Sequence, residues 1–384
     1  MLQLLFLLMS FGVMVLVPLG NSAYQLSYIE IGLLLIFVIQ FFRVFLIRNR
    51  QAKVKKNDSI YLFLLFLMII YSLISYFWSI SGITSLVGVT FFIYGFIVVL
   101  LSFFYDFKLR EYIIANRILL MSLTIQLTIN FYNSGQFSNT IGSYYNIKIF
   151  SSTLLGDSNY VSMFLTFIFT FEIIAKVKYW FPFTIISGLS IILTMSKGAI
   201  LALVSVIAIY IFVELISKKN KNKYKNFFSI TILGLLFIIA FTSSSLGKQT
   251  IQMINYSLNS GFSAGRDILY SSALNTIENN VFGIGYTNID NPHNFIVEGL
   301  RSYGILFGMI STLIFLYPLR HFFNLFRSEY NPVKLALLLS YFGLVTHGLI
   351  EIFFYTTPSI IWTMVTILII EGVFRNEYHD NSEL

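Results

Sequence analysis

The chain has 384 residues, of which 57% are hydrophobic and only 11% are charged. Soluble globular domains carry about a quarter of their residues as charged side chains, so this composition excludes a soluble protein and predicts a membrane protein. The formal net charge of +8 does not indicate nucleic acid, because the basic residues lie between apolar stretches and not on a polar face.

Apolar stretches long enough to cross a bilayer recur along the sequence. A membrane-spanning helix needs about 20 apolar residues. Runs such as residues 31–42 do not alternate between apolar and polar side chains, as the strands of a β-barrel would. We therefore predict an all-α, polytopic membrane bundle of about 12 helices that forms one membrane domain over residues 1–384. The predicted spans are 2–19, 28–47, 59–78, 84–105, 112–132, 158–175, 180–194, 199–216, 227–243, 302–318, 334–354 and 357–373.

The lysines and arginines are divided unequally between the two sides of these spans. Eighteen fall on one side and five on the other, while Arg43 and Arg117 fall inside spans. The positive-inside rule assigns the richer side to the cytoplasm. Both termini are therefore expected in the cytoplasm, and the longest polar interval, residues 244–301, is expected to be an extracytoplasmic loop that carries the active site.

Lys197 lies in a sharp turn between two predicted spans, at the expected outer boundary of the membrane. An ammonium group at the start of a helix, beside exposed backbone amides, can bind a phosphate. A lysine at this depth can equally extend to the lipid headgroups without any further role. Both interpretations stay open on the residues alone.

Arg266 begins a predicted amphipathic helix whose apolar stripe consists of Leu269, Ala273 and Ile277. Because the arginine lies close to that stripe, it can anchor an interfacial helix at the membrane surface. A planar guanidinium at headgroup level also matches a lipid diphosphate, which it can bind with two hydrogen bonds at once. Anchor and phosphate ligand are both open at this point.

His293 is a candidate general base. Asn291 is the predicted N-cap and Pro292 the first helical residue, which puts His293 in the opening turn of the helix that becomes the tenth span. The positive end of the helix dipole disfavours the imidazolium ion, so a neutral ring is expected there. The free amides of the same turn can bind an anion. An isolated exposed histidine more often has no chemical role, and that alternative remains.

Four further ionisable residues lie downstream. Glu298 and Arg301 are three residues apart on one helix and can form an ion pair, or Glu298 can orient a histidine or bind a sugar hydroxyl. His347 and Glu351 are four residues apart, hence on one face of the predicted eleventh span, near its outer boundary. We expect this second pair to line a cavity or to form hydrogen bonds between helices.

Residues 263–286 and 292–310 together resemble the core motif of the bacterial O-antigen polymerase and ligase superfamily (Wzy and WaaL types). In that motif a glycine-arginine pair opens a loop helix, a tight glycine-rich turn follows, and a histidine-asparagine pair precedes a glutamate and spaced glycines. The matching residues here are Gly265, Arg266, Gly283, Gly285, His293, Asn294, Glu298, Gly304 and Gly308.

Two shorter stretches extend the resemblance. Residues 193–203 are similar to the second motif of the superfamily, in which an arginine stands where this chain has Lys197. The lysine keeps the charge but cannot form the two parallel hydrogen bonds that a guanidinium can form. Residues 156–160, with Asn159 at the start of the predicted sixth span, are a third match.

The resemblance implies a metal-independent glycosyltransferase of the GT-C type, without a cofactor, at the outer face of the bacterial inner membrane. Its implied partners are an undecaprenyl-diphosphate-linked oligosaccharide, membrane lipid and a chain-length regulator protein, and no nucleic acid. We predict an O-antigen or capsular polysaccharide polymerase in which His293 and Arg266 are catalytic. The predicted substrate-binding residues are Lys197, Arg301, Glu298, Asn294, Asn159, His347 and Glu351.

Two alternatives accompany this prediction. A ligase of the same superfamily would transfer the glycan to a lipid A core. A flippase or other transporter of lipid-linked oligosaccharides would explain many spans and a cationic cavity without a role for His293. The two halves of the sequence show no sustained repeat, which argues against a transporter built from inverted repeats.

Overall fold

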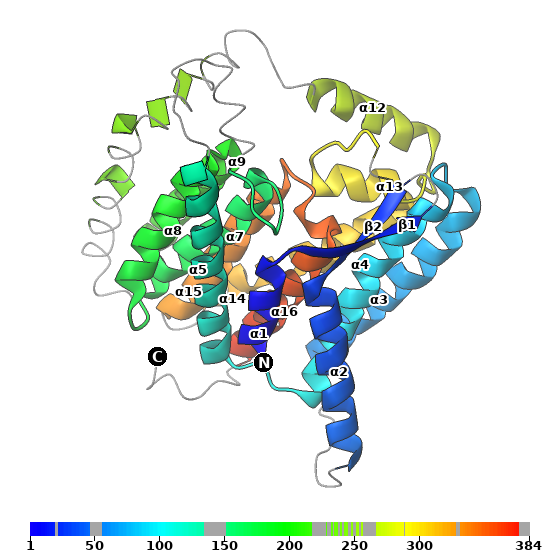
Figure 1. Ribbon diagram of the computed structural model, residues 1–384, viewed down its shortest axis with the longest axis horizontal. Coiled ribbons are helices and arrows are strands. Elements are labelled where there is room, and N and C mark those ends of the chain that lie inside the picture. Colours follow the sequence, from blue (N-terminus) through cyan, green and yellow to red (C-terminus); the bar gives the residue numbers. More distant parts are fainter. Residues whose placement is uncertain are drawn as a thin grey trace. The chain divides into compact units, whose positions relative to one another are not determined.

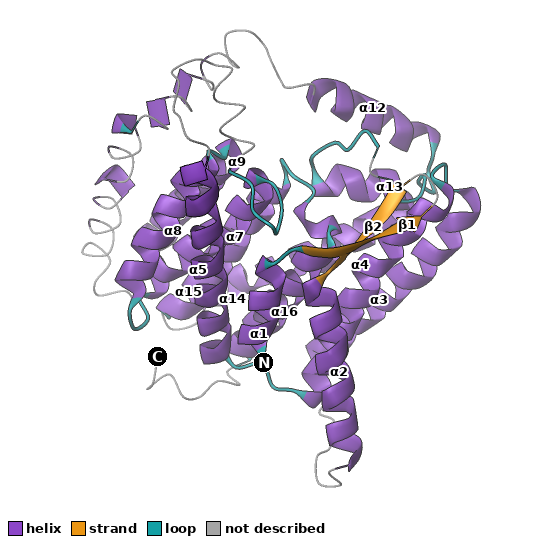
Figure 2. Ribbon diagram, in the orientation of Figure 1, coloured by secondary structure: helices purple, strands orange, loops and turns teal. Residues whose placement is uncertain are grey.

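The computed structural model describes residues 1–19, 22–46, 56–133, 151–216, 266–287, 289–327 and 331–375, with some single positions and short runs between 228 and 255. This part of the chain is mostly helical and contains one two-stranded sheet (Figures 1 and 2). It forms two compact units. The first unit comprises Met1–Asn116, Gly265–Pro318 and Gly348–Asn381, and the second comprises Arg117–Ala264, Leu319–His347 and Ser382–Leu384.

The described residues include six helical stretches that are long and apolar enough to cross a membrane. They are Asp58–Trp78, Gly82–Phe104, Leu109–Asn133, Ser158–Ala175, Phe295–Leu325 and Thr357–Phe374. Two shorter apolar helices are Trp180–Thr194 and Lys197–Val213. The protein is therefore embedded in a membrane. The predicted total of about 12 spans is not confirmed, and most of the predicted ninth span, 227–243, lies outside the described residues.

The predicted first span, residues 2–19, is wrong. Helix α1 (Leu2–Ser10) has only nine residues, and the chain then forms an antiparallel hairpin of β1 (Val13–Leu19) and β2 (Ser22–Ser27). Nine helical residues extend about 14 Å, less than half of the hydrocarbon core. Gly12, with a φ of 69°, ends the helical region, and the valine-rich stretch after it favours a strand.

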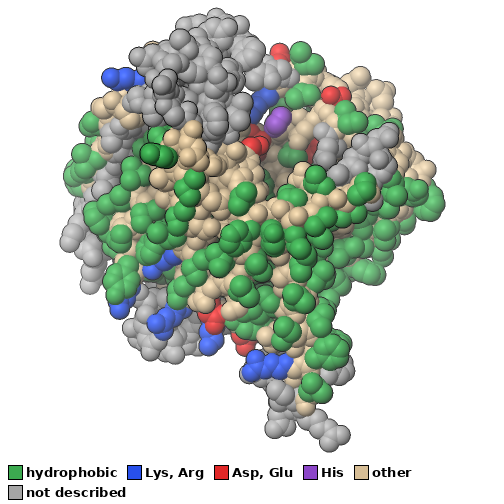
Figure 3. Space-filling view, viewed as in Figure 1, with side chains coloured by type: hydrophobic (Ala, Val, Ile, Leu, Met, Phe, Trp, Pro, Cys, Tyr) green, Lys and Arg blue, Asp and Glu red, His purple; other side chains and the backbone are tan. Residues whose placement is uncertain are grey.

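Helix α16 (Thr357–Phe374), in the first unit, is the most completely buried of the six candidate spans. This helix is buried along almost its whole length and packs against α4 (Val87–Phe104) and α2 (Tyr28–Leu46). Helix α4 packs in turn on α3 (Lys56–Ser75). Hydrophobic side chains are exposed on the outer faces of α2 and α3 (Figure 3). An apolar outer face and a packed interior are what a lipid-embedded bundle requires.

The second unit packs α7 (Ser158–Ala175) against α8 (Trp180–Thr194) and α9 (Lys197–Ile216). It also contains most of α5 (Leu109–Asn133), together with α14 (His321–Arg327) and most of α15 (Pro332–Gly348). The observed bounds of α7 and α8 are those predicted for the sixth and seventh spans. Asp157 caps α7 by accepting a hydrogen bond from the Tyr160 amide at 2.9 Å, so a local signal sets this boundary.

A buried ion pair joins α5 to α7. Arg117 donates to the two carboxylate oxygens of Glu172 at 2.7 and 2.8 Å, and its guanidinium lies 4.4 Å from the ring centre of Phe183. A charge inside a membrane span needs such a partner. The pair therefore holds three helices of the second unit together.

We expect Glu172→Gln to destabilise the protein by about 3–5 kcal/mol, because it leaves the Arg117 charge buried and unpaired. Thermal unfolding of the purified protein in detergent measures this loss. The double variant Arg117→Met, Glu172→Met is the matched control, since replacing both charges by apolar side chains is often close to neutral. A single variant as stable as the wild type would contradict the role assigned to the pair.

Candidate functional site

The arginine of the predicted loop helix lies where the sequence placed it. Arg266 is the first residue of α12 (Arg266–Asn279), which packs on α13 (Phe295–Leu316). The predicted apolar stripe faces inward, with Ala273 buried and Leu269 and Ile277 half-buried. The amphipathic interpretation of this helix is therefore confirmed.

Helix α13 is not one straight span. Gly304 has φ 73° and ψ 177°, which breaks the helix into residues 295–303 and 305–316. The ring centres of Phe295 and Phe315 are 6.3 Å apart, whereas a straight helix would separate these positions by about 30 Å. The two halves therefore fold back on each other. The prediction that the helix after His293 continues directly into the tenth span, 302–318, is wrong.

A tight turn and the residues after it, 281–285, lie against the break in α13. Three backbone hydrogen bonds of 3.0–3.1 Å join the two, from the amides of Ile284, Gly285 and Ile305 to the carbonyl oxygens of Arg301, Ser302 and Val281 respectively. Gly283 and Gly285 have φ values of 73° and 75°, so the tight reversal predicted there is confirmed. The reversal supplies the partners that the broken helix needs for its backbone groups.

Gly283→Ala is expected to disrupt this crossing. A Cβ atom at Gly283 would lie 2.3 Å from the Gly304 amide nitrogen, which is too close for any side chain. Gly82→Ala is the matched control, because Gly82 also has a positive φ of 53° but nothing within 4 Å of its Cβ position. The control should lose about 1–2 kcal/mol from the backbone conformation alone. Gly283→Ala should unfold at a clearly lower temperature than Gly82→Ala, and equal thermal stability of the two variants would contradict this account.

His293 precedes α13 and is not part of it. The N-cap is Asn294, whose side-chain oxygen accepts hydrogen bonds from the amides of Ile296 and Val297 at 2.9 and 3.0 Å. The predicted cap, Asn291, instead accepts a hydrogen bond from the His293 amide at 2.8 Å and closes a turn. His293 has a φ of 51°, a conformation that excludes it from a helix. The predicted helix start at Pro292 is therefore wrong by three residues.

Glu351 brings Arg266 and His293 together. One carboxylate oxygen, Oε1, accepts a hydrogen bond from Arg266 Nη2 at 3.1 Å, and the other, Oε2, lies 3.1 Å from His293 Nδ1. The side chains of Arg266 and His293 are 36% and 38% exposed, whereas that of Glu351 is 13% exposed. We call these three residues the Glu351 cluster. It presents a cation and an imidazole side by side on one partly buried carboxylate.

The predicted helical pairing of His347 with Glu351 is wrong. Helix α15 ends at Gly348, and Glu351 lies beyond it, before the short 3-10 helix Phe353–Tyr355. His347 is buried in the last turn of α15. Glu351 is thereby released from the helix and reaches the cluster from a connecting segment.

The connecting segment is attached to the start of α13. The side-chain nitrogen of Asn294 donates to the Leu349 carbonyl oxygen at 2.8 Å and to the Tyr270 hydroxyl. The rings of Phe295 and Phe354 pack edge to face, with their centres 4.8 Å apart. Asn294, predicted to bind substrate, thus uses its side chain to cap α13 and to hold the segment that carries Glu351.

Glu298 and Arg301 form the predicted ion pair, at 2.8 Å, and their side chains are only 1% and 4% exposed. Arg301 also donates hydrogen bonds to three backbone carbonyl oxygens, those of Thr287, Ile289 and Asp290. Ser302 donates to the other oxygen of Glu298 at 2.6 Å. The pair is enclosed, and it holds the loop that leads to His293.

The tyrosines near this pair are poor candidates for a base. Burial, and then the Glu298 carboxylate, raise the pKa of Tyr286 above its usual value. Burial likewise raises the pKa of Tyr355, which is hydrogen-bonded to Ser311. Across the described ranges there is no group of three or more His, Asp and Glu side chains arranged to hold a metal ion.

Lys197 and Asn159 belong to the second unit, as does His347, whereas the Glu351 cluster belongs to the first. Lys197 is the first residue of α9, after a turn in which Met195 has a φ of 52° and Ser196 accepts a hydrogen bond from the Ala199 amide at 3.3 Å. The predicted sharp turn is confirmed. The part of these three residues in substrate binding stays a prediction.

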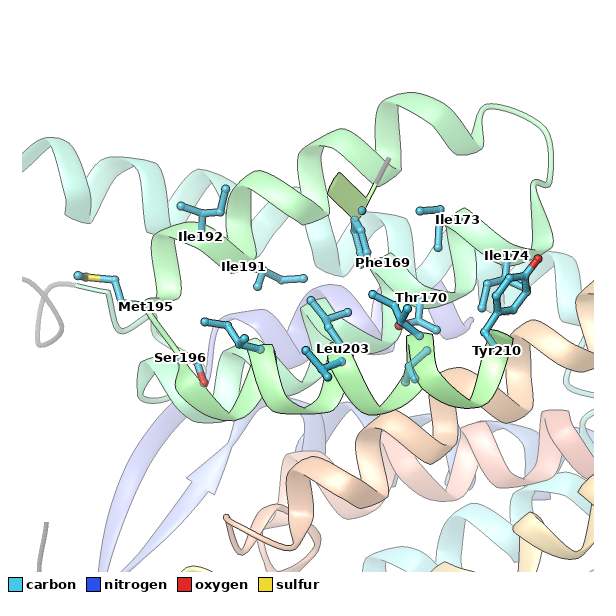
Figure 4. A pocket seen from close by; sticks show the side chains of 15 residues that line it. Phe169, Thr170, Ile173, Ile174, Ile191, Ile192, Met195, Ser196, Leu203 and Tyr210 are labelled. Atoms are coloured by element: carbon cyan, nitrogen blue, oxygen red, sulfur yellow. The ribbon is translucent and has the colours of Figure 1, made fainter. Parts of the chain in front are cut away.

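The second unit also contains a cavity of about 140 Å³ between α7, α8 and α9 (Figure 4). Its lining is almost entirely apolar, with Ser196 toward one end and Tyr210 at the other. None of the described residues that line it carries a charge. The cavity therefore offers mainly shape and apolar surface.

Residues 182–309 match a family model described as O-antigen ligase. The match supports the O-antigen ligase and polymerase superfamily. Members of this family are glycosyltransferase-like enzymes of lipopolysaccharide and glycan assembly. The matched stretch includes Lys197, Arg266 and His293 and ends before Glu351. No curated protein matches the chain.

Sequence reasoning had assigned Glu351 to a helix face with His347, and it did not connect this carboxylate to Arg266 or His293. The available signal was Gly348, which ends α15. Because the helix stops there, Glu351 lies on a connecting segment and reaches Arg266 and His293 from it.

Proposed function

We propose that this protein is a polysaccharide polymerase of the O-antigen or capsular type. It transfers a growing glycan from undecaprenyl diphosphate to a sugar hydroxyl of a second lipid-linked repeat unit. The observation that supports this proposal is the Glu351 cluster, in which Arg266 and His293 are both bonded to one carboxylate. The reaction needs a cation at the leaving phosphate and a base at the attacking hydroxyl, and the cluster supplies both within a short distance.

Arg266 is the phosphate ligand in this proposal. A guanidinium has five N–H donors, and the bond to Glu351 uses one of them. The others can bind the oxygens of the diphosphate, whose negative charge grows as the bond between the sugar and the phosphate breaks. Lys197 is a second candidate cation. The guanidinium of Arg301 is enclosed, so we assign it to the loop before His293 and not to the substrate.

His293 is the general base in this proposal. Its Nδ1 atom lies against Glu351, so Nε2 is the nitrogen available to the acceptor hydroxyl. A carboxylate on one ring nitrogen favours the tautomer with the proton on that nitrogen and leaves the other able to accept one. As the new bond between the sugar carbon and the acceptor oxygen forms, Nε2 takes the proton of the hydroxyl. Base catalysis of this kind contributes about 10²–10⁴ in rate.

We place the reaction at the outer face of the bacterial inner membrane, on a GT-C-type fold with both termini in the cytoplasm. The unequal distribution of lysine and arginine supports this orientation. Arginine and lysine take the place of a metal ion in neutralising the diphosphate. A chain-length regulator is the protein partner that fits a polymerase.

A ligase is the second candidate, because the matching family model is described as O-antigen ligase. Surface glycans from a deletion strain distinguish the candidates on a gel. Single repeat units on the lipid A core indicate a lost polymerase, and bare core with lipid-linked polymer indicates a lost ligase. Accumulation of lipid-linked repeat units on the inner side of the membrane would indicate a lost flippase and would contradict both.

A further inference from the structure

We infer that the Glu351 carboxylate is bonded to Arg266 while no diphosphate is present. When the substrate binds, its phosphate replaces Glu351 on Arg266, and Glu351 remains bonded to His293. The inference rests on the proposed function and adds an order of events to it. The lipid-linked donor binds first, and its binding prepares His293 to act as the base. Glu351 is a positioning residue, because it acts through Arg266 and His293 and does not itself contact the reacting atoms.

The carboxylate contacts Arg266 and His293 through different oxygens. Oε1 is bonded to Arg266 and Oε2 lies against His293, so one contact can break while the other remains. In the described part of the chain, Glu351 is the residue to which the Arg266 side chain is bonded. A phosphate that takes Arg266 therefore competes with this carboxylate.

The two partners of Glu351 differ in how firmly they are held. The segment that carries Glu351 is bonded to the Asn294 side chain, which also caps the helix directly after His293. Glu351 and His293 are thus connected through one short, hydrogen-bonded structure. Arg266 comes from α12, which the Tyr270 hydroxyl also joins to Asn294, and it reaches Glu351 through a long side chain that can change its rotamer while the backbone stays in place. The arginine is the partner that can turn toward a ligand.

Charge decides the direction of the exchange. A diphosphate carries more negative charge than a carboxylate and can bind a guanidinium through two parallel hydrogen bonds, so it can displace Glu351 from Arg266. The displaced carboxylate is no longer neutralised by the arginine. It stays beside Nδ1 of the His293 ring and stabilises the positive charge that the ring gains when Nε2 accepts a proton. Donor binding and activation of the base are coupled through this one residue.

The test is the substitution Glu351→Gln, which keeps the size of the side chain and removes its charge. Binding of inorganic pyrophosphate to the full-length protein in lipid nanodiscs is measured by calorimetry. We expect the variant to bind pyrophosphate about tenfold tighter or more, because the competing and repelling carboxylate is gone. Turnover of lipid-linked repeat units should fall by about 10²–10⁴, because His293 loses the carboxylate that orients it. Compared with the wild type, the variant should have a lower KM for the lipid-linked donor and a much lower kcat, and this combination supports the exchange.

Two variants serve as controls. Glu278→Gln makes the same substitution on an exposed position of α12, and neither pyrophosphate affinity nor turnover should change. Arg266→Gln should abolish pyrophosphate binding. Melting temperatures of all variants show whether each is folded, and Glu351→Ala provides a second charge-free variant if the glutamine variant is not.

The outcomes separate the two proposals. If wild-type protein binds pyrophosphate through Arg266 but the charge-free Glu351 variants bind it equally well or more weakly, the exchange is overturned and the proposed function stands. If folded wild-type protein binds no pyrophosphate, or binds it equally well without Arg266, the diphosphate site itself is overturned. Tighter binding together with slower turnover supports the exchange.

Discussion

Replacing His293 by alanine is expected to abolish polymer while leaving the protein folded in the membrane. The imidazole accepts the proton of the acceptor hydroxyl in the proposed mechanism, a contribution of about 10²–10⁴ in rate. Its side chain is 38% exposed and, among the described residues, is hydrogen-bonded to Glu351, so its removal should leave the packing of α13 intact. Surface-glycan gels of a deletion strain carrying the variant measure the effect, and immunoblots of the membrane fraction measure the amount of protein.

A second variant separates base catalysis from positioning. His293→Asn retains an amide that can donate a hydrogen bond to Glu351, but it cannot accept the proton of a hydroxyl. It should be as inactive as the alanine variant. His379→Ala, in the C-terminal tail, is the matched control and should give normal polymer. Chains of wild-type length from either folded His293 variant would rule out this residue as the base.

Arg266→Ala is expected to eliminate binding of the phosphate donor and to reduce polymer formation by about 10²–10³ or more. The loss has two sources, since the variant removes the cation for the diphosphate and also the partner of Glu351 Oε1. Arg266→Lys keeps the charge but cannot form two parallel hydrogen bonds, so it should retain part of the activity. Pyrophosphate binding by purified protein and gels of surface glycans measure the two effects.

The control for the arginine is Arg110→Ala, which removes an exposed arginine outside the Glu351 cluster. It should change neither pyrophosphate binding nor polymer length. Normal polymer from folded Arg266→Ala protein would show that the cation of the leaving group lies elsewhere. Lys197 would then be the residue to replace next.

Local signals in the sequence were sufficient for several elements. Helix α7 begins after Asp157, a good N-cap, and it ends as predicted at Ala175, followed by Lys176 in a left-handed conformation with a φ of 48°. The last helix, α16, begins at Thr357 with a proline beside its start, also as predicted. In both helices the apolar run and its capping residues are neighbours in sequence, so no distant contact is needed to define the boundary.

Hydropathy did not predict the path of the backbone where that path depends on hydrogen bonds from another segment of the chain. Residues 302–318 are apolar whether the chain is straight or folded back at Gly304. The break is stable because residues 281–285 supply hydrogen bonds to the freed backbone groups. The valine-rich stretch after α1 is likewise apolar as a helix or as a strand, and its pairing with Ser22–Ser27 makes it a strand. Such partners cannot be read from the composition of either segment.

The sequence by itself determined that this is a helical membrane protein and that Arg266 and His293 are its leading candidates for chemistry, because composition and local motifs carry that information. Only the tertiary structure decided that the two residues meet and that Glu351 joins them. That carboxylate reaches the cluster because α15 stops at Gly348 and the following segment is bonded to the Asn294 side chain. Contacts between segments so far apart along the chain depend on where each helix ends and on what it packs against, and neither is a property of the residues immediately around Glu351.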